Sequence, residues 1–262
     1  MAMPPPPPLM GQSRLEEGSR PGGPPPPHAE IPVFMVYMNV INTTTHLLLG
    51  AVAFFAFIIT NAVFGSNFPK FNAHVYLTVI GYSILMSQAI FSLNPQTGWA
   101  NNFKYPQKTM IFWLLQVLGS LLAIIGCVMA VVAVGEVNNV TIPIPIPGVP
   151  GITIRGMGHL DTAHGIIGLV AMILTTASLV GGLAHMFNNN VKNNSMLKAI
   201  YSCTLTLTLV MAFIAICLQF SDSRSLLLDT NANMAIAFTV LTLVGMFIMM
   251  ICNMTVGGRI LL

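Results

Sequence analysis

Two histidines lie inside long apolar segments of the sequence, where an ionisable side chain is unusual. His74 lies one turn inside the run from Phe71 to Asn94, and His164 lies near the start of the run 159–187. An ionisable residue within a membrane segment is costly and generally faces the interior of a helix bundle, so both are candidate functional residues. Imidazole is a common ligand of transition metals, including haem iron. Iron ligation is therefore the first chemistry to consider.

The composition places these segments in a membrane. Of the 262 residues, 55% are hydrophobic and only 6% are charged, whereas about a quarter of residues are charged in a soluble domain. Six apolar segments reach the ~20 residues that a helix needs to cross a bilayer. They lie at 46–64, 72–93, 108–134, 159–187, 196–220 and 233–254. The sequence thus predicts an all-α, six-helix transmembrane bundle in a lipid bilayer.

The other segments are expected outside the membrane. Residues 1–30 hold two proline runs and predict a disordered Pro-rich tail, either a spacer or a docking site for a proline-recognising domain. Residues 31–262 form the predicted membrane domain. Prolines 143, 145 and 147 favour an extended path between the third and fourth spans. The four cysteines, all in apolar segments, predict neither disulfides nor a zinc site, and we expect no nucleic-acid partner.

The distribution of basic residues predicts the orientation. With six spans, seven of the ten Lys and Arg fall on the side that holds both termini, so this side is expected to be cytoplasmic. The sequon at Asn139 then falls in an exoplasmic loop, as glycosylation requires. The membrane is either the plasma membrane or that of an endomembrane vesicle. The basic residues on the cytoplasmic side are Arg14, Arg20, Lys104, Lys108, Lys192, Lys198 and Arg259.

This topology places His74 and His164 at similar depth near the exoplasmic side. Two histidines on antiparallel helices can ligate one haem iron from opposite faces. Small residues follow each ligand at helical spacing; they could clear room for a porphyrin or merely let helices touch. His46 and His185 lie at the cytoplasmic side and are either a second haem pair or rings satisfied by headgroups and water. The small residues are Thr78 and Gly81 after His74, and Gly168, Ala171 and Thr175 after His164.

Over about residues 40–255, these features resemble the cytochrome b561 family of six-helix, ascorbate-dependent oxidoreductases. The resemblance implies haem b, with His74 and His164 as ligands. It also implies transfer of one electron at a time from ascorbate to an acceptor such as ferric iron, in a protein that often forms homodimers. The residues that carry the resemblance are Phe71, Asn72, His74, Gly81 and Gln88-Ala89 in the second span, Lys108 and Leu115-Gln116 in the third, and His164 with Gly168-Leu169 in the fourth.

The chain also departs from the family. The family's cytoplasmic haem is held by histidines near the starts of the third and fifth helices, where this chain has Ile111-Phe112 and Ile200-Tyr201. The resemblance therefore implies one haem, on the exoplasmic side, unless His46 and His185 hold a second.

Four further residues are candidates for binding an anionic reductant such as ascorbate. Arg155 and His159 lie close to the exoplasmic pair, and a guanidinium recognises anionic oxygens well. Lys108 and Lys198 lie near the starts of the third and fifth spans, on the cytoplasmic side, where the family places basic residues. Arg155 could instead be an interfacial anchor, and the lysines could be topology determinants. The alternative function is a redox-inactive scaffold or regulatory protein that keeps the bundle. A transporter or channel is less consistent with spans that hold almost no charge.

Overall fold

The computed structural model describes residues 33–64, 68–93, 102–137, 141–142, 152–153, 161–187, 195–222 and 229–257. The chain divides into two compact units, Met1–Val33 and Phe34–Leu262. The helices described below form the second unit, and the predicted proline-rich tail lies outside the described residues.

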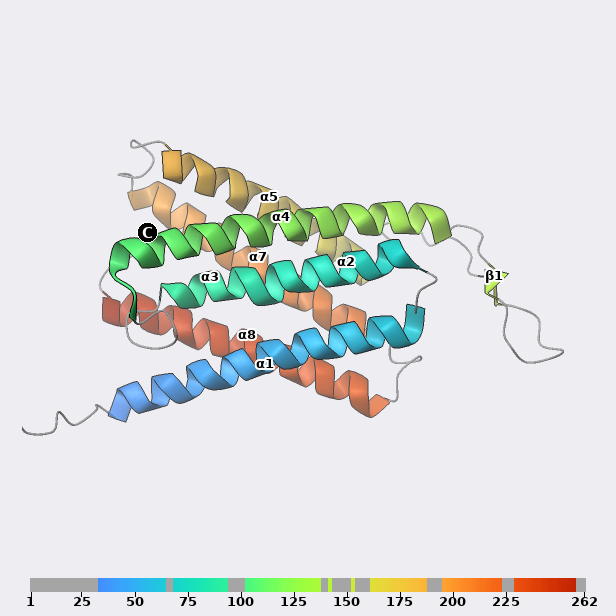
Figure 1. Cartoon of the computed structure of the whole chain (residues 1–262), viewed down its shortest axis with the longest axis horizontal. Coiled ribbons are helices and arrows are strands. Elements are labelled where there is room, and N and C mark those ends of the chain that lie inside the picture. The colour runs from blue at the N-terminus through green and yellow to red at the C-terminus, as the bar shows by residue number, and fades with distance from the viewer. Residues whose placement is uncertain are drawn as a thin grey trace, which may run out of the picture. The chain divides into compact units, whose positions relative to one another are not determined.

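In the described part of the chain, six helical segments are long and apolar enough to cross a membrane, which confirms the predicted fold class. Figure 1 shows that they alternate in direction, so that α1 begins and α8 ends at the same end of the bundle. The bounds are α1 (Val33–Phe64), α2 (Pro69–Val79), η1 (Ile80–Met86), α3 (Ser87–Ser92), α4 (Tyr105–Val137), α5 (Ala163–Phe187), α7 (Ser195–Asp222) and α8 (Asp229–Gly257).

The second span is one continuous helix with a π-helical centre. It runs from Pro69 to Ser92, and the seven residues of η1 separate α2 from α3. Pro69 starts it at a first-turn position, where the missing backbone N–H leaves no hydrogen bond unmade. A π-helical stretch inside an α-helix is uncommon and often lies at a functional site. The sequence did not predict it.

Two pairs of adjacent helices form the part of the bundle that holds the histidines. α2 packs along α4, and α5 packs along α7. A Cβ atom on Gly81 would lie 2.7 Å from the Gly119 carbonyl oxygen and 2.8 Å from the Ala123 nitrogen on α4. Gly81 therefore serves close contact between the two helices. Of the two interpretations of this small residue, room for a porphyrin and helix packing, the structure favours helix packing.

The loop that carries the alternating prolines contains a short antiparallel pair of strands. β1 (Thr141–Ile142) pairs with β2 (Ile152–Thr153), with Thr141 opposite Thr153 and Ile142 opposite Ile152. The extended path predicted for this loop is confirmed at these four residues. The three prolines themselves lie outside the described part of the chain.

Apolar side chains cover much of the outer surface, as lipid contact requires. Leu47 on α1 and Met110 on α4 are about 70% exposed, at 71% and 70%. Buried hydroxyl groups instead bond to main-chain carbonyls one turn earlier in their own helices, as Thr60 does to Ala56 and Thr239 to Ala235. These bonds satisfy polar groups that hydrocarbon could not.

Candidate haem-ligand site

The ring of His74 is held by a carbonyl group of the neighbouring helix. Its Nδ1 lies 2.8 Å from the Gly126 carbonyl oxygen on α4. A carbonyl can only accept, so Nδ1 carries the proton and Nε2 carries the free lone pair. The close approach depends on Gly126, because a Cβ there would lie 2.8 Å from Thr78 Cγ2 and 2.9 Å from the Thr78 nitrogen.

His164 is held in the same way by the other helix pair. Its Nδ1 lies 2.8 Å from the Ala215 carbonyl oxygen on α7. The same argument fixes the tautomer, with the lone pair on Nε2. Metal-bound histidines generally donate their other ring N–H to a carbonyl or carboxylate, which orients the ring and raises its basicity. Both histidines are therefore in the tautomer and the setting of metal ligands.

The two rings lie close together across the space between the helix pairs. Their centroids are 6.3 Å apart and their planes are inclined at 72°. An imidazole nitrogen lies about 2 Å from a metal and about 1 Å from its ring centroid, so two rings on opposite sides of one metal have centroids about 6 Å apart. The observed separation matches axial ligation of a single iron. The described residues contain no group of three or more His, Cys, Asp or Glu that could hold a metal.

A narrow cavity of about 50 Å³ lies beside both rings. Its walls are mostly apolar, and α1 contributes to them together with α2, α5 and α7. A Cβ atom on Gly168, one turn beyond His164, would meet nothing within 4 Å. The ring separation fits two ligands of one metal, whereas the cavity is smaller than the roughly 300–1,000 Å³ of pockets for drug-sized ligands. The lining residues are Ala56, Ile59, Thr60, Phe71, His74, Val75, Thr78, Val79, His164, Ile216, Gln219 and Phe220.

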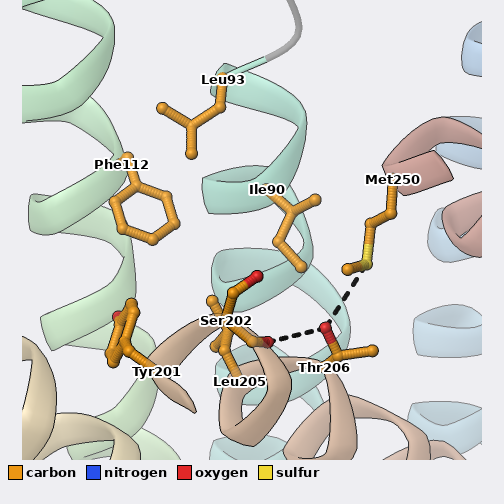
Figure 2. Close-up of a pocket in the computed structure, with 8 residues that line it drawn as sticks. All are labelled: Ile90, Leu93, Phe112, Tyr201, Ser202, Leu205, Thr206 and Met250. Carbon is orange, nitrogen blue, oxygen red and sulfur yellow. Dashed lines mark hydrogen bonds between the residues drawn. The ribbon is translucent and has the colours of Figure 1, made fainter. Parts of the chain in front are cut away.

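Aromatic and apolar side chains fill the opposite end of the bundle. Phe112 and Tyr201 are 2% and 6% exposed, and they lie in one hydrophobic cluster. Figure 2 shows both side chains at a small pocket, of about 10 Å³, with Ile90 and Leu93 of the second span nearby. At the positions that correspond to the family's second haem, the described structure therefore presents packed rings rather than imidazoles.

His46 and His185 lie against different partners. His46 Nδ1 is 2.7 Å from the Asn42 carbonyl oxygen and its Nε2 is 3.1 Å from Gln88 Oε1. His185 is buried and stacks on Trp113, with ring centroids 5.9 Å apart. Among the described contacts, none brings these two histidines together. A second haem pair stays a prediction.

The four candidate substrate-binding residues are described only in part. Arg155 and His159 lie outside the described residues. Lys198 lies in α7, but its side chain is outside the described part of the chain. Lys108 lies in the first turn of α4 and is 7% exposed. The structure brings together His74 and His164, and it leaves the substrate-binding residues as predictions.

The fold and the site define a multi-pass integral membrane protein with a half-buried pair of candidate haem ligands. A family model described as eukaryotic cytochrome b561 matches residues 73–227, which include both histidines. The chain belongs to the cytochrome b561 family. The helices α1 and α8 lie wholly outside the matched residues.

The similar proteins include the transmembrane reductase CYB561D2 of three mammals. The chain is 22% identical to the Mus musculus protein, 23% to the Bos taurus protein and 22% to the Homo sapiens protein, each over 155 residues. The match covers 59% of this chain and 60% of each relative. The chain thus spans less than two thirds of the relatives that it matches.

Sequence reasoning missed the groups that orient the two histidines. The acceptors are main-chain carbonyls of Gly126 and Ala215, and a main-chain carbonyl has no residue signature. The one available signal was size, because a glycine or alanine on a neighbouring helix lets an imidazole approach the backbone closely. That signal recurs at many positions in this chain and could not select these two.

Proposed function

We propose that this protein is a haem b membrane cytochrome in which His74 and His164 are the axial ligands of one haem. The observation that carries the proposal is the matched geometry of the pair. Each ring donates Nδ1–H to a carbonyl of its partner helix, and the centroids are 6.3 Å apart. A haem held by two imidazoles supplies a one-electron couple between ferric and ferrous iron.

The residues of this chain would hold and insulate that couple. Gly126 and Ala215 keep the rings in the coordinating tautomer through their carbonyl groups. Apolar side chains of α1 and α7, among them Ile59 and Phe220, lie beside the rings and would limit the access of water to a bound group, which would strengthen local electrostatic interactions. A haem held by both imidazoles would supply electron transfer rather than activation of a further ligand at the metal.

Ascorbate as donor and ferric iron as acceptor are the proposed substrates, at the exoplasmic face. The family membership and the name of the relatives, transmembrane reductases, support a reductase. Arg155 and His159 are the proposed anion-binding residues near this face. The cytoplasmic termini, the homodimer and the docking of a proline-recognising domain on the tail are part of the same proposal.

Difference spectroscopy of the purified protein in detergent tests the proposal. With haem supplied during expression, the reduced-minus-oxidised spectrum should show a sharp b-type band at one haem per chain. His74→Ala and His164→Ala should each abolish it, because either change leaves a single axial ligand. Wild-type protein that takes up no haem under these conditions would contradict the proposal. Reduction by ascorbate of the same sample then tests the donor.

A redox-inactive scaffold or regulatory protein is the second candidate. The cavity beside the histidines, at about 50 Å³, favours it, because pockets for ligands of drug size have volumes of roughly 300–1,000 Å³. The packed aromatic end, where the family has its other haem, points the same way. This candidate requires a folded, six-span protein that stays free of haem.

A further inference from the structure

A chain of hydrogen bonds crosses the middle of the bundle. The Tyr82 hydroxyl, in η1, lies 2.8 Å from Thr175 Oγ1 on α5. Thr175 Oγ1 also lies 2.7 Å from the Ala171 carbonyl oxygen, which can only accept, so the threonine hydrogen is used there. The Tyr82 hydroxyl is therefore the donor to Thr175.

This chain links helices that the histidine bonds leave separate. The bond from His74 to Gly126 lies within the pair α2 and α4, and the bond from His164 to Ala215 lies within the pair α5 and α7. Neither of these two bonds fixes the distance between the pairs. The bond from Tyr82 to Thr175 does cross between them.

The surroundings make this link rigid. Tyr82 is 4% exposed and Thr175 is fully buried, at 0%, so water does not compete for the hydroxyl groups, and a hydrogen bond is stronger in such a medium. Tyr82 lies within the π-helical segment. Because each residue turns an α-helix by about 100°, the extra residue of a π turn changes the direction in which its side chains point.

We propose that Tyr82 and Thr175 are positioning residues that set the distance and the relative orientation of the His74 and His164 rings. The inference rests on the proposed function, because it assigns these residues a role toward the axial pair. It predicts that loss of the link lets the helix pairs shift against each other while each histidine keeps its own carbonyl.

Tyr82→Phe and Thr175→Val test the positioning role in the haem-loaded protein, because each removes a hydroxyl group at nearly constant side-chain volume. Both should shift the low-spin electron paramagnetic resonance signal, whose g values depend on the angle between axial imidazole planes. The affinity for haem should fall about threefold to tenfold, because this is the factor that corresponds to the loss of one hydrogen bond of about 1 kcal/mol. Thr175→Ser should restore both properties.

Tyr76→Phe is the matched control. Its hydroxyl, in the same span, donates to Asn61 Oδ1 on α1 at 2.8 Å and does not join the two helix pairs. It should leave the g values unchanged. Spectra of Tyr82→Phe and Thr175→Val that match those of Tyr76→Phe would overturn the inference.

A distance measurement that needs no haem separates this inference from the proposed function. Nitroxide labels at Val128→Cys on α4 and Ile166→Cys on α5 occupy exposed positions of the two pairs, in a background where the four native cysteines, Cys127, Cys203, Cys217 and Cys252, are replaced by alanine. Tyr82→Phe should broaden the label-to-label distance distribution, and Tyr76→Phe should not. Equal distributions would overturn the positioning role, whereas wild-type protein without haem would overturn only the proposed function.

Discussion

The rings of Trp113 and His185 stack with centroids 5.9 Å apart and an angle of 28° between their planes. His185 is 21 residues beyond His164 on α5, about 31 Å along the helix, so this stack marks the end of the bundle away from the candidate ligands. Trp113 also packs against Phe112 and Tyr201, with centroids 5.1 and 5.7 Å away. This end is thus held by aromatic packing.

Gly182→Ala should destabilise this aromatic end and leave the histidine pair intact. A Cβ there would lie 2.7 Å from Trp113 Cζ3 and 3.2 Å from Tyr201 Cε2. Overpacking of this kind costs about 1–3 kcal/mol, which thermal unfolding in detergent would detect. The neighbouring Gly181→Ala is the control, because its nearest contact would be an ordinary 3.6 Å. Equal stability of the two variants would contradict the packing described here.

Tyr201→Phe should leave stability unchanged or raise it by about 1 kcal/mol. The Tyr201 hydroxyl is buried and has no hydrogen-bond partner among the described residues, and a buried polar group without a partner is unfavourable. Tyr82→Phe, by contrast, should lower stability, because its hydroxyl is bonded. The same unfolding measurement compares the two, and a loss of stability in Tyr201→Phe would show that the hydroxyl does find a partner.

His46→Ala and His185→Ala should leave the haem content at one per chain. His46 is engaged through both ring nitrogens, with Asn42 and Gln88, and His185 stacks on Trp113. Each substitution should lower stability through lost contacts only. Pyridine haemochrome quantification checks this, with His74→Ala as the variant expected to lose haem. A content of two that falls to one in either variant would establish the second pair.

Gly126→Ala should weaken haem binding through the backbone. The added Cβ would press on Thr78 at 2.8 Å and move α4 from α2, which lengthens the bond from His74 to the Gly126 carbonyl. Loss of such an orienting partner typically costs ten- to a hundredfold in metal affinity. Gly50→Ala, on α1 with nothing within 4 Å, is the control. Haem titration of the apoprotein would measure the difference, and matching affinities would exclude this route.

The fold was predictable because its main determinant is local. Apolar runs of sufficient length define the six spans, and the pairing of His74 with His164 followed from their depth alone. The carbonyls of Gly126 and Ala215 were not predictable, because they depend on how closely helices approach. Gly81 illustrates the ambiguity: its size fits a cofactor or a helix contact, and only coordinates show the Gly119 carbonyl against it.

The first helix contributes part of the wall beside the two histidines. α1 lies outside the segment that matches the family, yet Ala56, Ile59 and Thr60 line the cavity beside the two histidines. The helices that hold the rings are α2, α4, α5 and α7, so substitutions on this face of α1 would leave the ligand geometry in place. If relatives differ in which molecules reach the rings, we expect the differing residues on this face of α1, because substitutions there disturb the two histidines least.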